Sequence, residues 1–201
     1  CVGPKIEYAV VETYNPYDAE KLTLVMAASR VAAYLKSEGE ITDGGELPEY
    51  DRGDKYVPYR IVGRVMGTEL EGLHYQQLMP WVKPVEQTGD FAPKFVNDYA
   101  AAHPEKVFAS EDGRDKFVEM ESEAFRIILG DYVTTDDGTG IVHIAPTFGA
   151  DDAKVAKDAN IPALYLISKK GQTRPMVDLQ GKYYTFEELD QNFVKACVNK
   201  K

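Results

Sequence analysis

The stretch Asp136-Asp-Gly-Thr-Gly-Ile-Val-His-Ile-Ala-Pro-Thr-Phe-Gly-Ala-Asp-Asp152 combines a turn, a strand and the start of a helix. Asp137-Gly138 is typical of a hairpin turn, and the apolar residues after it predict a strand over 140–144. That strand ends at Pro146, because proline cannot donate a hydrogen bond to a sheet. A helix is predicted to follow over 151–160. The stretch therefore predicts a strand-to-helix junction, which is a common place for a ligand site.

Polar side chains stand at both sides of this junction. His143 is the polar residue of the predicted strand, and Asp151 and Asp152 lie in the first turn of the predicted helix. We expect His143 and one aspartate to lie on one rim. Each also has a structural explanation: a core histidine satisfied by hydrogen bonds, and acidic residues that complement the helix N-terminus, worth about 0.3–1 kcal/mol. From the residues alone, both explanations stay open.

The sequence on either side predicts short strands and few helices. Because no regular β-α-β alternation occurs, we expect an α+β fold with a mostly antiparallel, β-barrel-like core and peripheral helices. Residues 1–201 are expected to form a single domain. Strands are predicted over 6–13, 22–26, 56–66 with a bulge at Gly63, 127–133 and 164–168, and helices over 27–35, 91–102 and 185–198, the last with a Thr185–Glu188 capping box.

Two further predictions concern pairing and exposure. Residues 127–133 and 140–144 are predicted to pair as a hairpin through the Asp-Gly turn. Residues 113–126 are predicted to be extended, so that Glu119, Glu121 and Glu123 alternate onto one face of a strand. That face is interpreted as solvated, because glutamate is rarely buried without a partner.

The composition is that of a soluble globular protein. The chain has 201 residues, 23 Lys and Arg against 33 Asp and Glu, and a net charge of −10. No apolar run reaches the ~18 residues of a membrane helix, and the first residues lack a signal-peptide pattern. The chain does not begin with Met, so we expect a piece of a longer, cytoplasmic protein with no membrane partner. The acidic balance argues against autonomous binding to nucleic acid, because such binding depends on Lys and Arg at phosphates.

The common catalytic signatures are missing. The sequence has no phosphate-binding loop, zinc-protease motif or serine-hydrolase elbow. His74, His103 and His143 lack metal-ligand spacing, so we expect no metal and no cofactor. Cys1 and Cys197 cannot make a disulfide framework, and Cys197 is interpreted as a packing residue rather than a nucleophile.

Residues 138–152, here called the signature segment, closely resemble the signature of the editing domain inserted in class I isoleucyl-tRNA synthetases. Further matches extend the resemblance over nearly the whole chain: Val2–Tyr8, Gly67–Tyr75 running on to Met79-Pro80, and Phe125–Asp137. In the related valyl and leucyl enzymes, Lys or Met usually stands at the position of His143, and Pro-Ala-His-Asp replaces Pro146–Gly149. His143 and Phe148-Gly149 therefore favour the isoleucyl type.

The resemblance implies hydrolysis of valine mischarged onto tRNA(Ile), after transfer and also before it. A pocket for isoleucine cannot strongly reject valine, because one methylene is worth only about 1–3 kcal/mol, a limit for which isoleucyl-tRNA synthetases are the standard example. A second, smaller site must then accept valine and exclude isoleucine by size. The implied partners are the valine-carrying 3′ end of tRNA(Ile) and the remainder of a parent, ATP-binding synthetase.

The resemblance also assigns roles to residues. Asp152 matches the aspartate that binds the substrate's α-ammonium group, and His143 matches the residue that limits the size of the pocket. These two are the predicted catalytic residues, and hydrolysis is expected to use a positioned water, helped by the terminal ribose hydroxyl. The further residues predicted to bind substrate are Gly138, Thr139, Gly140, Ile141, Val142, Ile144, Phe148 and Asp151.

Three alternatives stay open: an editing domain of valyl or leucyl specificity, a catalytically silent module that positions the tRNA acceptor end, and an unrelated α+β binding domain. The family's pocket also uses a threonine-rich peptide of the form Thr-Thr-Pro-Trp-Thr, which precedes Gly3-Pro4 in the family and is not in this chain. The isolated segment is therefore expected to be weakly active.

Overall fold

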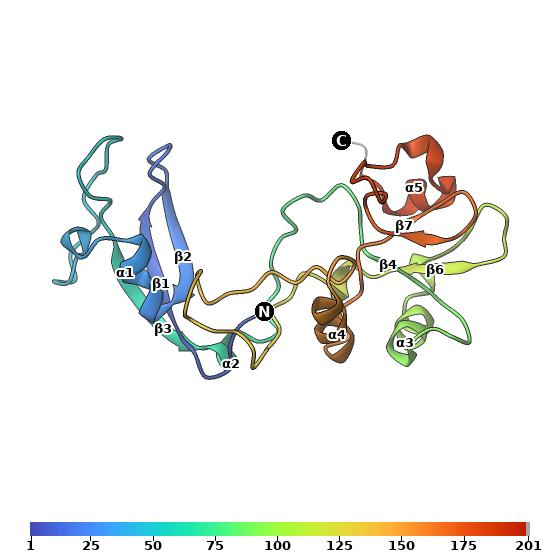
Figure 1. Cartoon of the computed structure of the whole chain (residues 1–201), viewed down its shortest axis with the longest axis horizontal. Helices are drawn as coiled ribbons and strands as arrows, with labels where there is room; N and C mark the ends of the chain where they lie inside the picture. The colour runs from blue at the N-terminus through green and yellow to red at the C-terminus, as the bar shows by residue number, and fades with distance from the viewer. Residues whose placement is uncertain (200–201) are drawn as a thin grey trace. The chain divides into compact units, whose positions relative to one another are not determined.

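The computed structural model describes residues 1–199 and divides the chain into two compact units (Figure 1). Unit 1 consists of Cys1–Leu73 with Ile127–His143, and unit 2 consists of His74–Arg126 with the chain from Ile144 onward. The expectation of a single domain stays a prediction. No helix among the described residues is long and apolar enough to cross a membrane.

Unit 1 is built on an antiparallel sheet with strand order β2-β1-β3 (Figure 1). Its strands are β1 (Glu7–Tyr14), β2 (Lys21–Ala27) and β3 (Arg60–Met66), which confirms the three strands predicted there. The register shifts where Val10 and Val11 pair with Gly63 and Ile61, which leaves Val62 as the extra residue of the predicted bulge.

One face of this sheet is covered by a short helical segment. The 3₁₀ turn η1 (Ala28–Arg30) and helix α1 (Val31–Tyr34) occupy the region predicted as one helix over 27–35. Alternate residues of β1 face this cover, as the two-residue period of a strand requires. The buried residues of this cluster are Ala9, Val11, Met26, Val31, Leu35 and Tyr59. Two further short helical segments of unit 1 are η2 (Ser37–Gly39) and α2 (Gly67–Leu70).

The predicted hairpin of 127–133 with 140–144 is wrong. Neither segment forms a regular strand, and each instead makes an isolated bridge to Val2, through Leu129 and Ile141. The backbone of Val2 accepts a hydrogen bond from Gly130 N at 3.0 Å and donates one to Ile128 O at 2.9 Å. The N-terminal residues thus occupy the pairing edge that a hairpin partner would need.

Unit 2 has a three-stranded antiparallel sheet with order β4-β6-β5, formed by β4 (Val85–Gln87), β5 (Val107–Ala109) and β6 (Lys116–Glu119). Neighbouring residues of β6 face opposite clusters. Val118 packs with Val96 and Tyr99 of helix α3 (Lys94–Ala102). Phe117 belongs to the larger cluster, whose members include residues of β7 (Leu166–Ile167) and helix α5 (Gln191–Cys197).

The remaining elements of unit 2 include helix α4 (Ala150–Asp158), which confirms the helix predicted over 151–160, and β8 (Thr173–Arg174), which pairs with β7. The 3₁₀ turns are η3 (Pro104–Lys106), η4 (Glu121–Glu123) and η5 (Phe186–Glu188).

Two sequence predictions in unit 2 need correction. The row Glu119, Glu121 and Glu123 does not share a strand face, because β6 ends at Glu119 and the next residues turn into η4. The terminal helix is interrupted: the predicted capping box is present, but it caps only η5, and α5 begins after Asp190. Asp190 is fully buried, and its carboxylate accepts hydrogen bonds from Phe193 N and Glu111 N.

The α+β class with antiparallel sheets is confirmed. The barrel-like core is not seen: residues 1–199 form three small sheets of three, three and two strands, and no closed barrel. The strands are short, from two to eight residues, and each sheet is covered by helical or irregular segments rather than closed on itself.

Candidate functional site

The first part of the signature segment is a turn whose carbonyl oxygens point into unit 1. Arg30 Nε donates to Gly138 O at 2.8 Å, and Ala27 N donates to Thr139 O at 2.8 Å. The Tyr8 hydroxyl donates to Gly140 O at 2.7 Å. Three successive carbonyl groups are therefore fixed by donors from β1, the end of β2 and η1.

The backbone conformation of this turn favours glycine at two positions. Gly138 and Gly140 have φ angles of 57° and 73°, in the left-handed region that disfavours side chains. Gly140 is also buried, and a Cβ atom there would lie 2.6 Å from Ala27 Cβ. The backbone at Gly140 thus approaches β2 more closely than any other residue type permits.

Tyr8 connects this turn to the start of the chain. Its ring is fully buried, and its hydroxyl accepts a hydrogen bond from Gly3 N at 2.8 Å while it donates to Gly140. Burial raises the pKa of Tyr8, against an opposing effect of the Gly3 hydrogen bond. The hydroxyl therefore keeps its proton and stays a donor at neutral pH.

His143 lies at the end of unit 1 and is exposed. The preceding backbone is held by Cys1, whose carbonyl accepts from Val142 N at 2.9 Å. The His143 ring makes no hydrogen bond or ion pair with any residue from 1 to 199. The alternative of a core histidine satisfied by hydrogen bonds is therefore wrong, and the ring is free to meet a ligand.

Asp152 is positioned by the first turn of α4, in unit 2. Its Oδ2 accepts a hydrogen bond from Ala145 N at 3.0 Å, and the side chain is half-buried. Gly149 precedes the helix in extended conformation, and a Cβ there would lie 3.2 Å from Asp152 Oδ2. Asp151 is exposed and makes no hydrogen bond within the described chain. Of the two aspartates, Asp152 is the one held in place.

The remaining predicted site residues divide between the units. Ile141, which is 39% exposed, belongs to unit 1, with Val142 beside it. Ile144, which is half-buried, and Phe148, which is 61% exposed, belong to unit 2. The structure thus groups Gly138 to His143 in one unit and Ile144 to Asp152 in the other. That all of them contribute to one site stays a prediction.

Sequence reasoning missed the residues that support the turn. Tyr8, Ala27 and Arg30 are far from Gly138 in sequence, and neither a local motif nor the match over Val2–Tyr8 indicates that they hold this turn. Groups of three His, Cys, Asp or Glu residues able to hold a metal are absent from residues 1–199.

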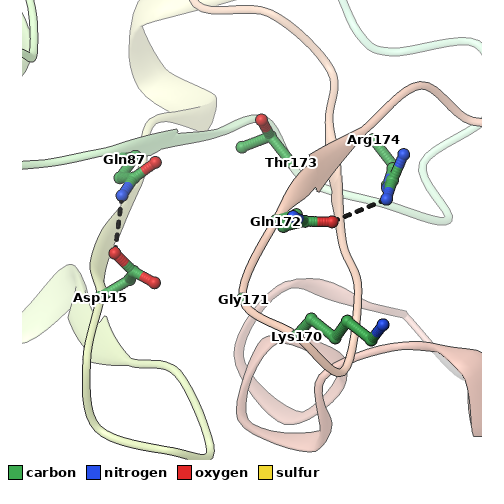
Figure 2. Close-up of a pocket in the computed structure, with 7 residues that line it drawn as sticks. All are labelled: Gln87, Asp115, Lys170, Gly171, Gln172, Thr173 and Arg174. Carbon is green, nitrogen blue, oxygen red and sulfur yellow. Dashed lines mark hydrogen bonds between the residues drawn. The ribbon is translucent and has the colours of Figure 1, made fainter.

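Two cavities lie in unit 2, and no residue of the signature segment is among their lining residues. The polar one, of about 560 Å³, is lined by Gln87, Asp115 and the residues from Lys170 to Arg174 (Figure 2). The apolar one, of about 360 Å³, has Trp81, Met176 and Tyr183 among its lining residues. Neither cavity was indicated by the sequence.

The chain was compared with known proteins. No protein-family model matches it. It is 49% identical over 199 residues to an isoleucine–tRNA ligase of Bacteroides thetaiotaomicron, and 45% identical over 199 residues to that of Bacteroides fragilis. It is 41% identical over 200 residues to the isoleucine–tRNA ligase of Porphyromonas gingivalis. These matches cover 99% of this chain but only 14–15% of each relative's length.

Proposed function

We propose that this chain, which corresponds over nearly its whole length to one segment of isoleucine–tRNA ligases, is the editing segment of such an enzyme. In this role it hydrolyses the ester that joins valine to the terminal adenosine of tRNA(Ile). The products are free valine and tRNA with an intact 3′ end. The identity to the relatives supports the enzyme class, and the signature segment supports the reaction.

The observation that carries the proposal is the state of Asp152. One carboxylate oxygen is fixed by Ala145 N, whereas Oδ1 accepts no hydrogen bond from the described residues. A carboxylate held in this way can receive the α-ammonium group of an aminoacyl ester through a charge-assisted hydrogen bond. The hydrogen bond to Ala145 also removes the rotational freedom that substrate binding would otherwise have to restrict.

His143 supplies the selectivity in this proposal. Its ring is exposed and without hydrogen-bond partners among residues 1–199, so it is available to contact the substrate side chain. Isoleucine differs from valine by one methylene, so a rigid limit on side-chain size rejects the correct amino acid and accepts the wrong one. The fixed backbone from Gly138 to Val142 provides the rigid surface from which the His143 ring projects.

The hydrolytic step needs an oriented water and a stabilised ester, and we propose no protein nucleophile. Attack of the water on the ester carbonyl releases the ribose oxygen, which takes a proton and becomes the terminal hydroxyl of the tRNA. Asp152 orients the aminoacyl group for this attack, so its contribution is one of positioning the reacting carbonyl. The neighbouring ribose hydroxyl assists the proton transfer.

The test compares two substrates, valyl-tRNA(Ile) and isoleucyl-tRNA(Ile), with the full-length synthetase that carries this segment. We expect rapid loss of valine and no enzyme-dependent loss of isoleucine. Equal, slow loss of both amino acids would contradict hydrolysis, and would favour a silent module that only positions the acceptor end. A third outcome is rapid loss of threonine from a tRNA mischarged with threonine, while valine stays on tRNA(Ile). This outcome would favour valyl specificity instead.

A further inference from the structure

The loop between β7 and β8 is a tight hairpin whose tip is formed by lysines. Ser168 N donates to Gln172 O at 2.9 Å, and Gly171 N donates to Ser168 O at 2.8 Å. Gly171 has a φ angle of 72°, as expected for a three-residue hairpin loop that ends in a left-handed residue. Lys169 and Lys170 therefore lie at the tip, displayed by a fixed backbone.

This hairpin presents three cations: Lys169, Lys170 and Arg174 are all exposed. None of them makes an ion pair within residues 1–199, and Arg174 Nη2 donates only to Gln172 Oε1 at 2.7 Å. The concentration of unpaired positive charge is notable in a chain whose net charge is −10. Free cations on a rigid loop attract anions more strongly than cations already neutralised by a carboxylate.

Carboxylates also lie near the hairpin, but none forms an ion pair with Lys169, Lys170 or Arg174 within residues 1–199. Asp115 lines the same cavity and keeps its charge, and its Oδ1 accepts a hydrogen bond from the neutral amide of Gln87 at 2.8 Å. Figure 2 shows the Lys170 and Arg174 side chains on the opposite side of the hairpin from Asp115. Glu188, whose carbonyl accepts from Lys169 N, also keeps its charge, because the hydrogen bond from Thr185 N lowers the pKa of its carboxyl group.

The hairpin is also held firmly beside the polar cavity. Gly171 is buried with a φ angle of 72°, and a Cβ atom there would lie 2.9 Å from Asp115 Oδ2, so this position favours glycine. The cavity of about 560 Å³ offers amide and hydroxyl groups from Gln87, Gln172 and Thr173 (Figure 2). These groups can hydrogen-bond to ribose or to a base edge. An acidic peptide has neither ribose nor bases, so the cavity favours RNA as the ligand.

We infer that the β7–β8 hairpin, through Lys169, Lys170 and Arg174, binds backbone phosphates of an RNA strand. The two lysines act as point charges, and the guanidinium group of Arg174 can contact a phosphate with two donors. The hairpin thus supplies positive charge for nucleic-acid binding that the composition of the whole chain does not suggest. The identification of the RNA as a tRNA rests on the proposed function. The inference of a phosphate-binding surface is independent of that function.

The test uses the 201-residue chain and a fluorescent RNA stem with a single-stranded CCA end, titrated over a range of NaCl concentrations. One variant combines Lys169→Gln, Lys170→Gln and Arg174→Gln. The matched control combines Lys5→Gln, Lys21→Gln and Arg52→Gln, which removes the same charge from exposed cations of unit 1. Circular dichroism checks that both variants fold, and the single variant Lys170→Gln replaces the triple variant if that fails.

We expect the hairpin variant to bind the RNA at least ~10-fold more weakly. The slope of log binding constant against log NaCl concentration should become shallower by about 2, because each phosphate contact contributes roughly 0.7–0.9 to it. The control should change both values much less. Equal weakening in the two variants would show a net-charge effect and overturn the inference. If tripolyphosphate at an equal concentration of charge displaces the RNA, the ligand is a simple phosphate anion and the inference of an RNA ligand is overturned.

The outcome is independent of the hydrolysis assay. Loss of RNA binding in the hairpin variant, together with a wild-type protein that does not hydrolyse valyl-tRNA, would support the hairpin site and refute the proposed function. If the hairpin variant binds RNA as the wild type does and the wild-type protein hydrolyses valyl-tRNA, the hairpin site is refuted and the proposed function is supported.

Discussion

The carboxylate of Asp152 accepts a hydrogen bond from the backbone N–H of Ala145 at 3.0 Å, which ties the first turn of α4 to the middle of the signature segment. The neighbouring Asp151 is exposed and has no such bond within the described chain. One of two adjacent carboxylates is thus oriented, and the other is solvated. The register of the signature segment points to the same residue, Asp152.

Replacing His143 should change the selectivity of the proposed site without affecting the fold. His143 is exposed, so His143→Ala is expected to alter the free energy of unfolding by less than about 0.5 kcal/mol. The smaller side chain should admit isoleucine, and deacylation of isoleucyl-tRNA(Ile) should become measurable. The bulkier His143→Trp should slow the loss of valine. Unchanged lifetimes of both esters in both variants would contradict a sizing role, and His74→Ala serves as the control.

Gly140→Ala should destabilise unit 1 more than Gly138→Ala does. Both positions have positive φ, which costs an alanine roughly 1–2 kcal/mol. At Gly140 a Cβ also meets Ala27 Cβ at 2.6 Å, which adds an overpacking cost of about 1–3 kcal/mol, whereas at Gly138 nothing lies within 4 Å. Urea unfolding monitored by circular dichroism measures the difference. Equal losses at the two positions would show that the close approach to β2 is not a constraint.

Tyr8→Phe should show what the buried hydroxyl contributes. The substitution leaves Gly3 N and Gly140 O without their partner in a fully buried environment, at a cost of about 1–3 kcal/mol in the free energy of unfolding. The control Tyr17→Phe changes a residue that is 84% exposed and should have almost no effect. A Tyr8→Phe protein as stable as the wild type would mean that water satisfies both groups.

Glu86 predicts a pH dependence in unit 2. Burial raises the pKa of Glu86, and the hydrogen bond from Ala163 N to its Oε1 only partly opposes this. The folded state therefore binds the proton more tightly than the unfolded state, so this group lowers stability as pH rises through the interval between its ordinary and its raised pKa. In Glu86→Gln the side chain stays neutral and keeps an acceptor for Ala163 N.

Glu86→Gln should accordingly be more stable than the wild type above the raised pKa of Glu86. The advantage should shrink as the pH falls through that interval and vanish below the ordinary carboxyl pKa. Urea unfolding of both proteins at a series of pH values tests this. A difference that stays constant with pH would mean that the carboxyl group is not perturbed by folding.

Much of the fold followed from local patterns. The strands of unit 1 were predictable because 6–13 is rich in β-branched and aromatic residues and 22–26 is a short apolar run, and the bulge because Gly63 interrupts the third run. The hairpin at 127–144 was not, because Asp137-Gly138 is a local signal, whereas the pairing partner is Val2, at the other end of the unit's sequence. Tertiary pairing thus overrode a strong turn motif.

The C-terminal helical region shows a second limit of prediction from sequence. Thr185 and Glu188 form the predicted capping box, but the motif cannot specify how long the helix behind it will be. Asp190 caps the start of α5 through Phe193 N, and its buried carboxylate also accepts a hydrogen bond from Glu111 N in the loop between β5 and β6. A longer-range contact thus holds the residue at which the helix starts.

For the candidate site, the sequence identified the segment and the aspartate but not the supports. The resemblance gave the register of Asp152, and the hydrogen bond to Ala145 N now gives this residue a fixed orientation. Arg30 has no motif, and the match over Val2–Tyr8 does not indicate that Tyr8 holds the turn at Gly140. Such supports become visible only when the chain is folded.

The most direct measurement is the rate of valyl-tRNA(Ile) deacylation by Asp152→Asn and Asp151→Asn in the full-length synthetase. Asn at position 152 can still accept from Ala145 N but lacks the charge that binds an ammonium group, so we predict an unchanged fold and a rate lower by about 10- to 100-fold. Asp151→Asn, which removes a solvated carboxylate with no hydrogen bond in the described chain, should lower the rate much less than Asp152→Asn. Wild-type hydrolysis by Asp152→Asn would contradict the account, because the oriented carboxylate would then have no role in binding the substrate.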